Sequence, residues 1–277
     1  MSELKTMLLH VDASANIGAR LEWASAFARM HDAHLAVSYA VLPSALHPYA
    51  LAGDGQAAAW LIEVDAEQQE RAKAAFKREV ARAGRPDALS WVEASGPPLQ
   101  AFVGHAWRAD MLLLAQHDPS AQTYSGVPGD FASAVLLASG KPGLVMPYIG
   151  GRATLGQNVL VAWKPTPESA RAVSAALPIL QRAEQVHVVV WNESDGDEPA
   201  LPDIDPYLRA HGVAPIVHRG GRPSSELGEL LLSRAADLQA DMLVMGCYGH
   251  GRAVEWVLGG VTRTILRSMT VPVLMAH

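Results

Sequence analysis

The sequence has one cysteine, Cys247, and no apolar run long enough to cross a bilayer. One cysteine excludes an internal disulfide and any metal site built from several cysteines. A membrane-spanning helix needs ~20 consecutive apolar residues. The amino-terminal segment meets Asp12 before an apolar stretch of signal-peptide length can form. These absences predict a cytoplasmic protein that does not enter membranes.

Charge of one sign is also scarce. Charged residues make up 18% of the 277 residues, the net charge is −6, and no block of like charges occurs. Nothing therefore favours binding to nucleic acid or to an acidic membrane surface. The sequence contains no G-x-S-x-G motif, so a serine hydrolase is not supported. The 49% hydrophobic content and the length fit one large or two ordinary globular domains.

The two halves of the chain repeat one pattern. The segment Ala-Asp-Met-Leu-Leu-Leu at 109–114 returns as Ala-Asp-Met-Leu-Val-Met at 240–245. A Pro-containing apolar segment follows each of them, at 141–146 and 271–275. The apolar starts at 7–12 and 159–164 also correspond, and glycines cluster at 150–156. We therefore predict a first domain over 1–150 and a second over 151–277.

Strands alternate with helices in each copy. In the second copy we predict strands over 158–163, 186–191, 214–218, 241–246 and 271–276, and helices over 167–183, 224–239 and 259–268. Continuous apolar strands suit a parallel sheet covered on both faces. The predicted fold is α/β, with two tandem doubly wound domains, each a five-stranded parallel sheet flanked by helices. Ligands bind such sheets beyond the carboxyl ends of the strands, here after Trp163, Trp191 and Met245.

Glycines follow the strand that ends at Met245. The sequence there reads Gly246-Cys247-Tyr248-Gly249-His250-Gly251, and nine residues separate Gly249 from Gly259-Gly260-Val261-Thr262, where a helix is predicted. Glycines let a backbone approach a ligand closely, and a helix start offers unpaired N–H groups to phosphate. His250 and Arg252 add positive charge, and Thr262 adds a hydroxyl. The alternative is that the glycines only make tight turns, since neither the P-loop nor the dinucleotide fingerprint matches.

These residues make the chain resemble a tandem universal stress protein along nearly its whole length. Nucleotide-binding members of that family carry the pattern G-x2-G-x9-G-[ST]. Gly246, Gly249 and Gly259 fall on its glycines, and Gly260 replaces the serine or threonine. The resemblance implies five parallel strands flanked by helices and pairing of the two domains within the chain. It also leaves a homodimer open as an alternative, although two domains fused in one chain can already pair the edges of their own sheets.

The resemblance further implies which copy binds nucleotide. Family members usually carry an aspartate at the end of the first strand, where it touches the base. The first copy has Asp12 there and the second has Lys164. The first copy lacks the glycine spacing, and Asp118 and Asp130 would repel phosphate, so we expect no ATP there. The predicted site for ATP with Mg, or for a related adenine nucleotide, comprises Ala162, Trp163, Lys164, Val190, Met245, Gly246, Gly249, His250, Gly251, Gly259, Gly260, Val261 and Thr262.

Three functional hypotheses follow. The leading one is a regulatory binding module whose nucleotide state is read in the stress response. The second is a slow ATPase using His250 or a bound water, and the third is a partner-binding stress protein with a vestigial loop. No general base or dedicated magnesium carboxylate is recognisable, so we expect weak hydrolysis or none. Trp163 and Trp191 either stack on a purine or, as we expect, pack beneath loops, and we interpret Cys247 as a buried thiol.

Overall fold

The computed structural model describes residues 3–12, 14–44, 55–94, 96–119, 126–150, 155–191, 203–220, 226–249 and 260–277. The chain divides into two compact units. One covers Leu4–Ser139, and the other covers Gly140–His277 together with the first residues of the chain. The sequence boundary at 150/151 remains our prediction of where the two repeats meet. Among the helices described, none combines the length and the hydropathy needed to cross a bilayer.

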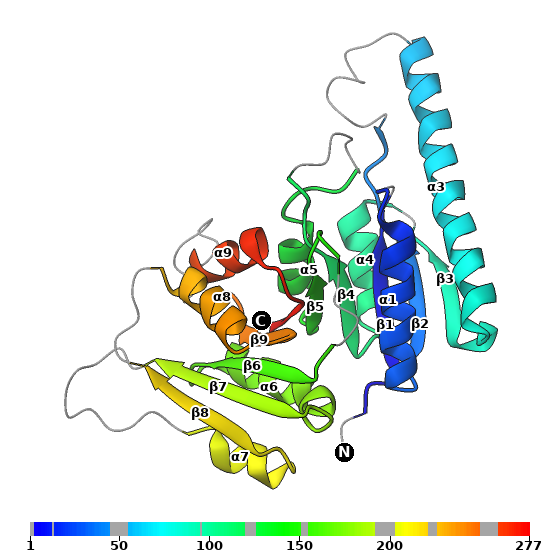
Figure 1. The fold of residues 1–277 in the computed structure, drawn as a ribbon. Helices are drawn as coiled ribbons and strands as arrows, with labels where there is room; N and C mark the ends of the chain where they lie inside the picture. Colours follow the sequence, from blue (N-terminus) through cyan, green and yellow to red (C-terminus); the bar gives the residue numbers. More distant parts are fainter. Residues whose placement is uncertain are drawn as a thin grey trace. The chain divides into compact units, whose positions relative to one another are not determined.

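The first unit is a parallel sheet with helices on it. Its strands follow the order β3-β2-β1-β4, and each neighbouring pair is parallel (Figure 1). The elements are β1 (Thr6–Val11), α1 (Ile17–Met30), β2 (His34–Tyr39), α3 (Gly55–Ala83), η2 (Pro86–Ala88), β3 (Leu89–Glu93), α4 (Pro98–Ala106), β4 (Met111–Ala115) and α5 (Phe131–Ser139). The central strands are fully buried, with Leu9 and Leu113 at 0% exposure, as continuous apolar strands require.

The second unit follows the order β5-β10-β9-β6-β7-β8. Its elements are β5 (Gly143–Met146), β6 (Asn158–Trp163), α6 (Pro167–Leu180), β7 (Gln185–Trp191), α7 (Asp205–Ala210), β8 (Pro215–Gly220), α8 (Leu227–Asp237), β9 (Met242–Gly246), α9 (Gly260–Ser268) and β10 (Val273–Ala276). Strands β10, β9, β6, β7 and β8 run parallel, α6 packs against β9 and β10, and α8 packs against α9 (Figure 1).

The fold class predicted from the sequence is confirmed, because both units are α/β layers built on parallel strands. The predicted strand 158–163 coincides with β6, and the other predicted strands of the second copy overlap β7, β8, β9 and β10. Helix α7 has no counterpart among the predicted helices. Its six residues give fewer than two turns, which is too short for a helical period to show in the sequence.

Strand β5 is the last strand of the first repeat in the sequence, yet it belongs to the second compact unit. It pairs antiparallel with β10, with Val145 opposite Val273 and Leu144 opposite Leu274. The edge of β10 that β9 leaves open is thereby hydrogen-bonded. Covering an exposed strand edge removes a template for aggregation.

An aspartate holds the start of β6 in the second unit. The carboxylate of Asp241, just before β9, accepts hydrogen bonds from the backbone N–H groups of Gly156, Gln157 and Asn158 at 2.9, 3.0 and 3.2 Å. Asp241 is only 4% exposed. A charged acceptor that satisfies three backbone donors fixes the register between β6 and β9.

The repeated Ala-Asp segment gives the first unit the same device. Oδ2 of Asp110, just before β4, accepts hydrogen bonds from the backbone N–H groups of Lys5 and Thr6 at 2.9 and 2.8 Å. The hydroxyl of Thr6 donates to the same oxygen at 2.9 Å. The aspartate of the repeat therefore ties the first strand to its neighbour in both copies, but Asp110 is exposed where Asp241 is buried.

Candidate functional site

The carboxyl ends of three strands meet at one edge of the second unit. Ala162 of β6 lies opposite Met245 of β9, and Trp163 lies opposite Val190 of β7. The chain leaves β6 for β7 on one side and returns to β9 on the other. The end of β6 is therefore the topological switch point, where open α/β sheets bind ligands. Gly246, the last residue of β9, lies at this edge too.

The predicted site residues differ in how far they are buried. The side chains of Trp163, Val190 and Met245 are 9%, 7% and 5% exposed, whereas Lys164 is exposed. Trp163 is therefore buried, while our expectation that it packs beneath a loop stays a prediction. Gly260, Val261 and Thr262 form the first turn of α9, where Thr262 is 3% exposed. The predicted positions His250, Gly251 and Gly259 lie outside the described residues, as does Arg252.

The first turn of α6 is fixed where the chain leaves β6. Thr166 is the N-cap, and its side chain accepts a hydrogen bond from the backbone N–H of Ser169 at 3.3 Å. Pro167 occupies the first turn, where its missing N–H costs nothing. The backbone N–H of Lys164 donates to the hydroxyl of Ser169 at 3.3 Å. The sequence Thr-Pro at a helix start is the signal that places this turn.

Gly246 and Gly249 lie against this turn. A Cβ atom on Gly246 would come within 2.5 Å of the backbone nitrogen of Ser169 and 2.8 Å of the carbonyl carbon of Glu168. A Cβ atom on Gly249 would meet only the end of a side chain, 2.9 Å from Oε2 of Glu168. Close packing against α6 therefore requires glycine at position 246. A side chain at position 249 would fit if the Glu168 side chain moved.

Glu168 also lies at this edge, beside Gly246 and Gly249, and no sequence motif pointed to it. It lies in the first turn of α6, and its side chain is 14% exposed. Oε1 is 3.4 Å from the guanidinium of Arg171. Oε2 is buried and has no hydrogen-bond partner among the described residues. An acidic residue in the first turn of a helix is common because it stabilises the helix dipole, so the sequence alone gave Glu168 no distinction.

Cys247 follows β9 and is 1% exposed. Burial, together with the nearby negative charge of Glu168, raises the pKa of the Cys247 thiol to about 12. The thiol therefore stays protonated at neutral pH, and thiols react as thiolates. The interpretation of Cys247 as a buried thiol is confirmed.

At the corresponding edge of the first unit, Asp12 is engaged by its own chain. Its carboxylate accepts hydrogen bonds from the backbone N–H of Ser14 at 3.0 Å and from the Arg20 guanidinium at 3.2 Å. Arg20 also donates to the Ser14 hydroxyl at 2.8 Å. Burial alone would raise the pKa of Asp12, but Arg20, His10 and Ser14 together hold it below its usual value. Both of these hydrogen bonds to Asp12 end on Oδ1.

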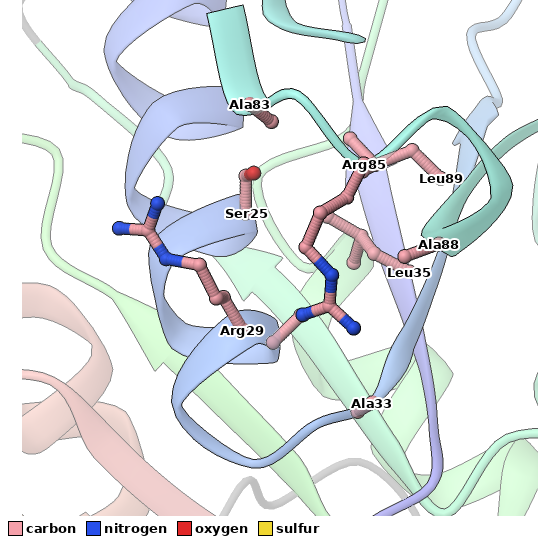
Figure 2. A pocket seen from close by; sticks show the side chains of 9 residues that line it. Ser25, Arg29, Ala33, Leu35, Ala83, Arg85, Ala88 and Leu89 are labelled. Atoms are coloured by element: carbon pink, nitrogen blue, oxygen red, sulfur yellow. The ribbon is translucent and has the colours of Figure 1, made fainter.

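A pocket lies in the first unit, beside the amino ends of β2 and β3. Figure 2 shows its lining side chains, with Arg85 between the end of α3 and the turn after α1. Arg85 donates to Asp32 at 2.9 Å. The pocket is at the sheet edge opposite to the carboxyl ends, where α/β sheets do not normally bind ligands. Its lining residues are Ser25, Ala28, Arg29, Ala33, Leu35, Ala83, Arg85, Ala88 and Leu89.

Comparisons with known proteins agree with this architecture. Residues 156–277 match the sequence profile of the Universal stress protein family. The fold is similar to that of a universal stress protein from Archaeoglobus fulgidus DSM 4304, with a TM-score of 0.71 and 18% identity, covering 98% of this chain and 97% of that one. A functionally unknown protein from Pseudomonas aeruginosa PAO1 has a TM-score of 0.59 and 14% identity, with 98% and 92% covered. No curated protein gives a significant match. The second copy therefore belongs to the universal stress protein family, and the chain as a whole has the tandem fold of that family.

Proposed function

We propose that the second domain binds ATP or a related adenine nucleotide and acts as a regulatory binding module in the stress response. The observation that carries this proposal is the position of Gly246 and Gly249 at the carboxyl end of β9, beside the end of β6. That edge is the switch point of the sheet. Membership of the second copy in the universal stress protein family supports the same conclusion.

The start of α9 suits phosphate. Its first turn contains no acidic residue, and no atom lies within 4 Å of the position that a Cβ on Gly260 would take. Unpaired N–H groups and the helix dipole favour an anion there. In this arrangement the base lies near Ala162, Trp163, Lys164 and Val190. Mg²⁺ prefers phosphate and water ligands, so ATP would bring it. Among the described residues, no group of three or more His, Cys, Asp or Glu side chains forms a metal site.

The substitution Gly249→Val is expected to weaken ATP binding at least ~10-fold, because removing a few backbone and ligand contacts costs ~1.4 kcal/mol or more. The fold should survive, since the new side chain meets only the flexible end of Glu168. Isothermal titration calorimetry with ATP measures the affinity. Thermal unfolding of the same samples measures the stability.

Gly104→Val in α4 is the matched control, because Gly104 is exposed and has no atom near its Cβ position. It should leave ATP binding unchanged. Equal affinity of wild type and Gly249→Val would refute the assignment of this turn to the nucleotide. The purified protein should also release about one ATP or ADP per chain on denaturation. Absence of released nucleotide together with no binding at millimolar ATP would refute the proposed function.

Gly260→Ser is expected to tighten ATP binding by roughly 2- to 10-fold, the effect of one added hydrogen bond. The substitution restores the hydroxyl that the family pattern carries at this position, and the Cβ enters open space. Gly260→Ala serves as the control, because it changes helix propensity without adding a donor. Equal affinities of the serine and alanine variants would show that phosphate does not reach the start of α9.

A second candidate function is a partner-binding stress protein whose loop has lost its ligand. It is favoured by one observation: packing against α6 accounts for Gly246 without any nucleotide. The slow ATPase remains a hypothesis that rests on His250, outside the described residues. The nucleotide measurements above separate the first two candidates, and phosphate release tests the third.

A further inference from the structure

We propose that Glu168 recognises the sugar of the nucleotide, its carboxylate accepting a hydrogen bond from a ribose hydroxyl. This inference rests on the proposed nucleotide function and adds the specificity of the same site. Nothing in the sequence pattern of the loop points to Glu168. The inference depends on the position of the carboxylate and on the missing hydrogen-bond donor to its Oε2.

The position of Glu168 places the carboxylate at the switch point. It belongs to the first turn of α6, which directly follows the end of β6. Its backbone packs against Gly246, and its Oε2 lies beside Gly249. The carboxylate is therefore next to the turn after β9 and not on the outer surface of α6, in agreement with its 14% exposure.

The carboxylate has an unused acceptor. Oε2 is buried and has no hydrogen-bond partner among the described residues, and Oε1 has only a long contact to the half-exposed Arg171. A buried acceptor without a donor is unfavourable, and a buried charged acceptor more so. The buried Cys247 beside it offers only a weak donor. A ligand that brings an O–H or N–H donor would relieve this cost.

The sugar is the part of a nucleotide that fits. Phosphate oxygens carry negative charge and only accept hydrogen bonds, so the Glu168 carboxylate repels them. Ribose hydroxyls donate, and hydrogen bonds to a carboxylate in a water-poor site are strong. The start of α9, whose first turn has no acidic residue, is left for the phosphates. The exocyclic amino group of adenine is the competing donor, and the test includes it.

The test compares ATP with 2′-deoxy-ATP, 3′-deoxy-ATP and inosine triphosphate, titrated into the full chain by calorimetry. Wild type is expected to bind ATP roughly 10- to 100-fold more tightly than at least one deoxy analogue, the range for one hydrogen bond to a charged group. Glu168→Ala should bind ATP and that analogue equally. Glu168→Gln, which keeps the shape and one neutral oxygen, should discriminate less than wild type.

Glu184→Gln is the matched control, because Glu184 is an exposed glutamate before β7, at the amino end of the sheet. It should preserve the wild-type preference. Equal binding of ATP and both deoxy analogues by wild type would overturn the inference and leave the proposed function standing. Discrimination against a deoxy analogue that survives in Glu168→Ala would also overturn it. So would a wild type that binds inosine triphosphate more weakly than ATP but binds both deoxy analogues as tightly as ATP. Failure of every nucleotide to bind would remove the proposed function and this inference together.

Discussion

Replacing Asp241 by alanine is expected to lower the free energy of unfolding by about 3–5 kcal/mol, since hydrogen bonds to charged groups contribute about 1.5–3 kcal/mol each and do not add fully. The carboxylate satisfies three backbone N–H groups at the start of β6 and is almost completely buried. Alanine leaves those donors without a partner in a region that water reaches poorly. Urea denaturation followed by circular dichroism measures the change.

The repeated sequence supplies an internal control for this prediction. Asp110→Ala removes the equivalent carboxylate from the first unit, where the site is exposed and water can replace the lost acceptor. We expect a loss of about 1–2 kcal/mol there. Equal losses at the two positions, or a loss below about 1 kcal/mol at Asp241, would mean that the carboxylate does not determine the register of β6.

The stability of the first unit is expected to fall by about 3 kcal/mol as the pH drops from 6.5 to 4, because of His10 alone. Burial lowers the pKa of His10 from 6.5 to about 4. Nε2 donates to the carbonyl of Ala40 at 2.8 Å, and the ring packs against Phe131 and Phe102. Between pH 6.5 and 4, His10 binds a proton in the unfolded chain but stays neutral in the folded chain. The stability is therefore complete above pH 6.5 and is lost as the pH approaches 4.

The variant His10→Gln isolates this effect. It keeps a donor for the Ala40 carbonyl and does not titrate, so its stability should be lower at pH 7.5 but flatter between pH 6.5 and 4. The folded-state pKa of Asp12 is depressed, and its contribution is lost only as the pH falls below its ordinary value of 3.8, outside this window. Parallel stability curves for wild type and variant would refute the assignment to His10.

The sequence predicted the elements better than it predicted their partners. Continuous apolar strands such as 158–163 and the repeated Ala-Asp segments are local signals, and they located β6, β9 and the tandem fold. The predicted close approach of Gly246 turned out to involve α6, because only the folded chain brings residues 168 and 246 together. Glu168 was missed for the same reason. An acidic first-turn residue looks ordinary until its oxygen is seen beside Gly249.

The pairing of β5 with β10 joins the last strand of the first sequence repeat to the last strand of the second. A segment cut at the sequence boundary carries β10 without the main-chain partner that Gly143, Leu144 and Val145 provide. The second half of the chain therefore depends on residues of the first half to cover the edge of β10. A further duplication, a deletion or a recombination event in this region must preserve residues on both sides of 150 to keep β10 covered.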